Sequence, residues 1–141
     1  MRSKYKAFTL LETLLALSIF VVLLPVVSSF FYRVIDKYEK SSVINREQAQ
    51  VIFAEDYLHG ISKYADSLTI IGDVLVIDGS GTSYEVGVKN KKLYVKQTAT
   101  RYLTVEPMKV VDYQIIMINN KYYKIKLRSE NGEYTIPLVM Y

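Results

Sequence analysis

The chain has 141 residues and a formal net charge of +4, with no cysteine and one histidine. The lack of cysteine excludes disulfides and thiolate metal sites, and a single histidine excludes a His-rich metal site and a Cys/His dyad. Beyond the apolar N-terminal region, about 109 residues remain (33–141), enough for one small domain with a modest core.

The first 32 residues combine a short basic leader with a long apolar segment. Arg2, Lys4 and Lys6 come first, Glu12 follows, and residues 13–32 carry no formal charge. Twenty helical residues rise about 30 Å, the thickness of a bilayer's hydrocarbon core, and the basic leader favours a cytoplasmic N-terminus. A carboxylate at the edge of such a segment is unfavourable, by roughly 3 kcal/mol at mid-membrane, so Glu12 requires a reason.

Three interpretations of this segment compete. A secretory signal peptide has a shorter apolar core and a small-residue cleavage site, for which Val27-Ser28-Ser29 is a poor substitute. A plain membrane anchor leaves Glu12 without a role. The third interpretation rests on the sequence Ala-Phe-Thr-Leu-Leu-Glu at residues 7–12, which follows the basic leader and opens the charge-free run. This arrangement resembles the processing site of type IV pilins and pseudopilins.

The resemblance implies that a prepilin peptidase cuts between Ala7 and Phe8 and that the new amino terminus, Phe8, is methylated. Residues 1–7 are then a leader peptide, residues 8–32 a transmembrane and filament-core helix, and residues 33–141 an exported pilin head domain. The family usually has glycine before the cut, where this chain has Ala7.

Glu12 becomes the fifth residue of the mature protein under this interpretation. In a filament of packed apolar helices its carboxylate can pair with the cationic amino terminus of a neighbouring subunit. A subunit one step out of register would leave a buried charge unpaired. We therefore expect Glu12, together with Thr9, to take part in assembly and register selection.

The apolar pattern predicts one helix from about Phe8 to about Tyr64. Apolar or small residues recur on one helical face at a 3-4-3-4-3 spacing, and Ile44 extends the face backward. The members of this stripe are Val51, Ala54, Leu58, Ile61, Ala65 and Leu68. Pro25 lacks a backbone donor and clashes with the preceding turn, which predicts a kink in the membrane half.

Beyond Asp66 the sequence changes to short β runs separated by turn signals. These runs predict strands at residues 68–71, 74–77, 82–88, 92–97, 113–118, 121–127 and 134–140. Pro137 cannot donate to a ladder, which favours an edge or bulged position for the last strand. The predicted fold class is α+β: a long N-terminal helix, its first half membrane-spanning, packed on a small antiparallel sheet. That order is the pilin layout.

The helix at residues 48–56, the small sheet and the C-terminal Tyr/Lys-rich strands are similar to ComGF, the minor pilin family of the Gram-positive competence pilus. This resemblance implies a structural subunit that helps pilus assembly for DNA uptake and transformation. Its partners would be the prepilin peptidase, other minor pilins, the major pilin and, before assembly, the membrane. A type II secretion pseudopilin, or a single-pass surface binding module outside any filament, remains an alternative.

The location implied is the cell membrane first and a surface pilus afterwards. A disulfide-free exported domain fits a Gram-positive surface. Enzymatic readings find little support, because the one histidine, His59, is expected to be a partly exposed helix residue without a triad context. We expect no catalytic residue, no metal site and no cofactor.

Charge is segregated along the chain. Residues 36–88 have a net charge of −5, and residues 89–128 have a net charge of +8. The candidate electrostatic or DNA contacts of the basic block are Lys89, Lys91, Lys92, Lys96, Lys124 and Lys126. Pairing with acidic faces of neighbouring pilins, a solvated strand face with the tyrosines packed inward, and direct DNA binding through phosphate contacts and stacking all remain open.

Overall fold

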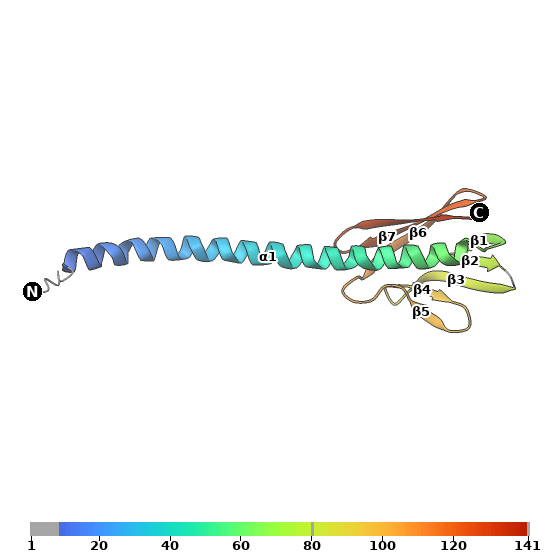
Figure 1. Cartoon of the computed structure of the whole chain (residues 1–141), viewed down its shortest axis with the longest axis horizontal. Coiled ribbons are helices and arrows are strands. Elements are labelled where there is room, and N and C mark those ends of the chain that lie inside the picture. The colour runs from blue at the N-terminus through green and yellow to red at the C-terminus, as the bar shows by residue number, and fades with distance from the viewer. Residues whose placement is uncertain (1–8, 80, 141) are drawn as a thin grey trace, which may run out of the picture. The chain divides into compact units, whose positions relative to one another are not determined.

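The computed structural model describes residues 9–79 and 81–140. The chain divides into two compact units, Met1–Ser41 and Ser42–Tyr141. One helix, α1 (Leu10–Ser62), supplies the described helical part of the first unit and continues into the second, where all the described strands lie (Figure 1). The predicted helix over residues 8–64 is confirmed within two residues at each described end.

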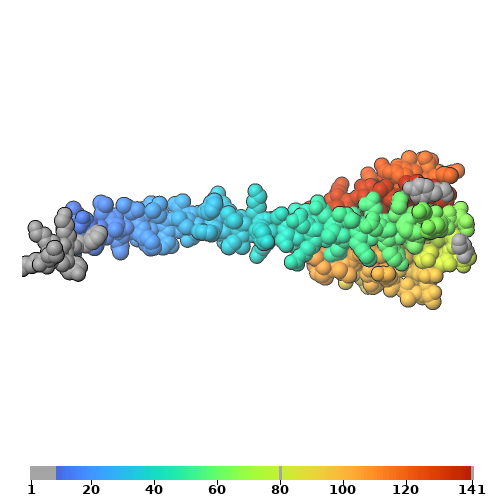
Figure 2. All heavy atoms as spheres, viewed as in Figure 1, coloured from blue at the N-terminus to red at the C-terminus, as the bar shows by residue number. Residues whose placement is uncertain are grey.

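The first unit exposes every side chain from Leu10 to Ser41 (Figure 2). By length and composition α1 could cross a membrane, and none of its most apolar stretch is buried within the protein. The helix continues through Pro25. Pro25 therefore does not divide the helix. Figure 1 shows no sharp bend of α1 in its view, and the predicted kink stays a prediction.

The second unit, called the head below, holds α1 from Ser42 onward and two antiparallel sheets. The five strands of the first sheet lie side by side in chain order. They are β1 (Ser67–Ile71), β2 (Val74–Gly79), β3 (Thr82–Lys89), β4 (Lys92–Lys96) and β5 (Thr100–Tyr102). The strands predicted at residues 68–71, 74–77, 82–88 and 92–97 are confirmed within two residues, and they pair as hairpins with turns at Gly72-Asp73 and Asn90-Lys91, whereas β5 was not expected.

The second sheet has three strands in the order β6-β7-β8. They are β6 (Val110–Asn119), β7 (Tyr122–Ser129) and β8 (Glu133–Val139). Pro137 lies on β8, which pairs with β7 alone, so the predicted edge position is confirmed. The α+β class is also confirmed, but the expectation of one small sheet is wrong. The first sheet ends at the short strand β5, and after the loop of residues 103–109 pairing restarts in a separate sheet.

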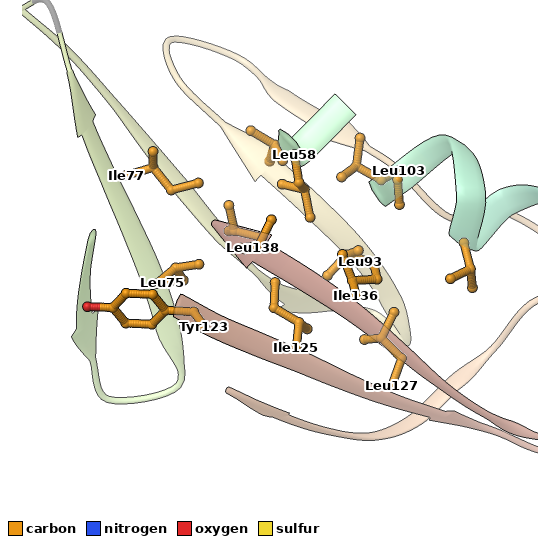
Figure 3. Packing of buried hydrophobic residues seen from close by; sticks show 14 of the residues in the cluster. Leu58, Leu75, Ile77, Leu93, Leu103, Tyr123, Ile125, Leu127, Ile136 and Leu138 are labelled. Atoms are coloured by element: carbon orange, nitrogen blue, oxygen red, sulfur yellow. The ribbon is translucent and has the colours of Figure 1, made fainter. Parts of the chain in front are cut away.

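The core of the head lies between α1 and both sheets, as Figure 3 shows. From the helix it receives Val51, Ala54 and Leu58, which confirms the centre of the predicted stripe. Leu68 is also buried, and Ile61 and Ala65 pack half-buried against this core. The stripe is wrong in placing Ala65 and Leu68 on the helix, because α1 ends at Ser62.

The stripe also differs at positions along α1 itself. Ile44 is exposed, whereas Glu47 and Ser62 are fully buried at in-phase positions that the stripe left out.

Side-chain hydrogen bonds tie these layers together. The Tyr123 hydroxyl of β7 donates to the Leu68 carbonyl of β1 at 2.8 Å, which links the two sheets. The Ser62 hydroxyl donates to the Val139 carbonyl at 3.4 Å, which links the end of α1 to β8. The Gln50 side-chain oxygen accepts the Val105 N–H at 2.8 Å and holds the loop after β5 against the helix.

Gly79 sits where the backbone of β2 meets the end of α1. A Cβ at this position would lie 2.8 Å from Ala65 Cα and would clash with the Tyr64 carbonyl oxygen. We expect Gly79→Ala to lower the free energy of unfolding by about 1–3 kcal/mol, because two backbone segments must move apart. Thermal unfolding of the full chain in detergent, followed by near-UV circular dichroism, measures this change.

Gly60→Ala is the matched control, because Gly60 lies in α1 with nothing within 4 Å of the added Cβ. The same chemical change should there raise stability by about 1 kcal/mol through helix propensity. Equal effects of the two substitutions would contradict the close approach at Gly79.

Candidate functional site

The described N-terminus of α1 begins with a reciprocal capping arrangement between Thr9 and Glu12. The Thr9 backbone N–H and its hydroxyl both donate to Glu12 Oε2, each at 2.9 Å. In return, the Glu12 N–H donates to the Thr9 hydroxyl at 3.4 Å. This is a capping box, which satisfies backbone N–H groups that have no partner within the helix. Glu12 therefore has a local structural role besides the expected role in assembly.

The capping box places the Glu12 carboxylate at the first turn of the helix in an exposed position. Both bonds from Thr9 end on Oε2, and within residues 9–79 and 81–140 its other oxygen, Oε1, accepts no hydrogen bond. One carboxylate can therefore cap its own helix and still accept a donor from outside. The expected cleavage and methylation site, Ala7 and Phe8, lies outside the described residues.

The apolar run after Glu12 has no protein partner within the described chain. Its large side chains are exposed, and Leu14, Phe20 and Phe30, for example, are each more than half exposed. Ser18 and Ser29 donate their hydroxyls to carbonyls three residues earlier, Leu15 and Val26, so these polar groups are satisfied inside the helix. The outer surface of the run is thus suited to lipid or to other apolar helices.

A second built site lies in the head around Glu47, whose side chain is fully buried. Its carboxylate accepts hydrogen bonds from Ser129 Oγ at 2.7 Å, Asn131 Nδ2 at 2.8 Å and Tyr134 Oη at 2.9 Å. The three donors belong to the end of β7, the following turn and β8. Burial of a charge is tolerated when hydrogen bonds satisfy it, so Glu47 fixes the β7–β8 hairpin to α1.

The electrostatics of Tyr134 reflect this site. Loss of solvent around the ring, the hydrogen bond to Glu47 and the nearby negative charge together raise the pKa of Tyr134 to about 12. Ionising this hydroxyl would remove a donor and bring a second negative charge to a buried carboxylate. Tyr134 therefore stays protonated and donating at neutral pH.

Sequence reasoning missed both of these arrangements, although each had a signal. Glu47 lies four residues before Val51, in phase with the buried stripe. This position indicates an acid inside the core, whose carboxylate needs hydrogen-bond donors from the protein. The Thr-x-x-Glu spacing at residues 9–12, before an apolar run, is a capping-box signature.

The six candidate lysines do not form one surface. Lys89, Lys91 and Lys92 gather at the β3–β4 turn, whereas Lys96 pairs with Glu85 across the strands at 3.1 Å. Lys124 and Lys126 lie on the other sheet, on the face of β7 opposite the buried Tyr123, Ile125 and Leu127. The expected alternation of β7 is confirmed.

His59 lies on α1 and is half-buried, as expected for a partly exposed helix residue. Within the described residues, no group of three or more His, Cys, Asp and Glu side chains could hold a metal ion. No protein-family model, curated protein or solved structure matches this chain. Its function is therefore inferred from its own residues.

We expect Glu47→Gln to lower the free energy of unfolding by about 1–3 kcal/mol, because its amide NH₂ would face donors where a carboxylate oxygen now accepts. The pKa of Tyr134 should also fall from about 12 toward 10.0, since the neighbouring charge is gone. Chemical unfolding of the full chain in detergent and ultraviolet titration of the tyrosines, compared with a Tyr134→Phe chain, measure both effects.

Asp56→Asn is the control, because Asp56 is exposed on the same helix. It should change stability by no more than about 0.5 kcal/mol. A Glu47→Gln protein as stable as the original chain would show that the Glu47 contacts do not hold the hairpin to the helix.

Proposed function

We propose that this chain is a subunit of a type IV pilin-like filament, a minor pilin that is processed by a prepilin peptidase. The proposal is carried by the order of features in residues 1–32: a basic leader, the Ala7–Glu12 sequence and an apolar run without formal charge. A continuous helix whose second part packs on a β-rich head supports it, because a filament of this kind requires such a helix to link its apolar interior to the heads.

The exposed apolar surface of α1 supports an assembled state. Residues 13–32 can be covered by lipid before assembly and by the helices of other subunits afterwards. Both environments exclude water. The subunit in the bilayer is then in a waiting state, held in the membrane until it is added to the filament. The chain would enter the membrane once, with its N-terminus in the cytoplasm.

Glu12 gives this proposal its specific mechanism. A neighbouring subunit's amino terminus, freed by cleavage before Phe8, would donate to the oxygen of Glu12 that Thr9 leaves open. Such a pair gains strength away from water, and an unpaired charge there is costly. The difference in free energy between a paired and an unpaired Glu12 carboxylate selects the register in which subunits are added.

The narrower assignment is to the competence pilus, on the similarity to the ComGF family. In that role the subunit would help pilus assembly for DNA uptake and would be located at a Gram-positive cell surface. Its partners would be the major pilin and the other minor pilins. The chain would act as a substrate of the peptidase and as a structural component, without a catalytic role of its own.

The Glu12 substitutions test the mechanism in the source cell. Glu12→Gln keeps a side chain that can complete the capping box but removes the charge, whereas Glu12→Ala removes both. If charge pairing sets the register, both variants should be cleaved normally yet lose pilus assembly by tenfold or more. Immunoblot mobility measures cleavage, and sheared surface fractions and transformation frequency measure assembly.

Thr9→Ala is the matched control, since it weakens the cap by about 1 kcal/mol and leaves the charge of Glu12 in place. It should retain most of the assembly. Normal assembly by Glu12→Gln would contradict the charge-pairing mechanism and leave Glu12 as a helix cap only.

A further inference from the structure

The β3–β4 turn concentrates positive charge at one point of the head. Lys89 and Lys92 are directly opposed across the two strands, and Lys91 lies between them. The N–H of Val110 donates to the Lys91 carbonyl at 2.9 Å, which brings the exposed Lys109 beside the turn. We define these four residues, Lys89, Lys91, Lys92 and Lys109, as the lysine tip.

The Lys92 ammonium lies 6.0 Å from the centre of the Tyr102 ring, a favourable contact, but two other features of the lysine tip oppose folding. Like charges directly opposite on neighbouring strands repel each other. The turn also holds Asn90 and Lys91 at φ values of 53° and 59°, a conformation for which glycine is preferred at the second position. Local sequence choices that oppose the fold are most often found where a protein meets a partner.

The lysine tip lies at the end of the head where α1 enters. At the other end of β3, Gly79 pairs with Thr82 and contacts the backbone of Tyr64 and Ala65, just after α1. The eight residues of β3 then run about 24 Å back along the head. At that level the Leu103 N–H donates to Leu93, and the neighbouring Val105 is bound to Gln50 in the early turns of the head's helix.

In sequence, residues 33–41 separate the charge-free segment from the head, and α1 is helical throughout them, a rise of about 14 Å. Gln50, at the level of the tip, lies 18 residues beyond Tyr32, about 27 Å along the helix. The opposite end carries the acids Asp66 and Asp78, whose backbones are hydrogen-bonded to each other. The loop of residues 103–109, which carries Lys109, contains one acid, Glu106.

We propose that the lysine tip binds the anionic phospholipid headgroups of the membrane that holds α1, before the subunit leaves the bilayer. The inference goes beyond filament assembly and rests only on α1 spanning a membrane. Lysines near an anionic surface each favour binding by about fivefold, and salt weakens the effect. Contact with lipid would hold the head down in the waiting state and be released when the subunit is extracted.

The experiment places one dye on the full chain, which has no cysteine of its own. Val105→Cys labels the exposed loop at the entry end, and Ser83→Cys labels the opposite end of β3. The protein is reconstituted into vesicles of phosphatidylcholine alone, or with an equal amount of phosphatidylglycerol, that carry an acceptor on lipid headgroups. Energy transfer from position 105 should be higher in the anionic vesicles and should fall with added salt, whereas transfer from position 83 should not rise.

Lys89, Lys91 and Lys92, changed together to Gln, should abolish the difference between the two vesicles. Lys121, Lys124 and Lys126, changed together to Gln, make the same change in charge on the other sheet and should leave it intact. Equal transfer in both vesicles, or equal loss in both triple variants, would overturn the inference. Transfer that follows the protein-to-lipid ratio instead would assign the lysine tip to another subunit and would also overturn it. A chain that fails to float with either vesicle would contradict the membrane span itself.

Discussion

The uncovered apolar surface of the first half of α1 is the constraint on which the rest of the molecule depends. Twenty residues without formal charge expose their side chains, and none of the described protein covers them. Removing apolar surface from water is favourable, so this surface is suited to lipid or to other apolar helices. The cap at Thr9 and Glu12, the absence of charge until Arg33 and the separate core of the head are all compatible with a helix that lies in lipid or among other helices.

The same helix has a different task after Ser42, where it becomes one layer of the head. Val51 and Leu58 contribute apolar burial, which has no direction, whereas Glu47 contributes three hydrogen bonds that specify where the β7–β8 hairpin sits. The Glu47 cluster and the Ser62–Val139 hydrogen bond therefore both link α1 to the second sheet. Replacing one donor would leave part of a buried carboxylate unpaired, so each of these few hydrogen bonds has a large effect on the stability of the head.

Much of the fold could be predicted from local pattern, and the remainder depended on tertiary contacts. The helix, the hairpins and the edge position of Pro137 follow from periodicity, turn residues and a missing donor. The division into two sheets could not be predicted, because it depends on how residues 97–109 pack on Gln50 and Leu93. At the site, residue identity predicted that Glu12 matters. Only geometry showed that Thr9 engages one of its oxygens and that the candidate lysines lie on two sheets.

The most direct test of the account is the mature amino terminus of the protein in its own cell membrane. Mass spectrometry of the N-terminal peptide should find residues 1–7 removed and a methylated Phe8. Cleavage there exposes the amino group that Glu12 is proposed to bind on a neighbouring subunit. An intact Met1 would contradict processing as a pilin, and a terminus near Ser29 would show that the apolar segment is a signal peptide.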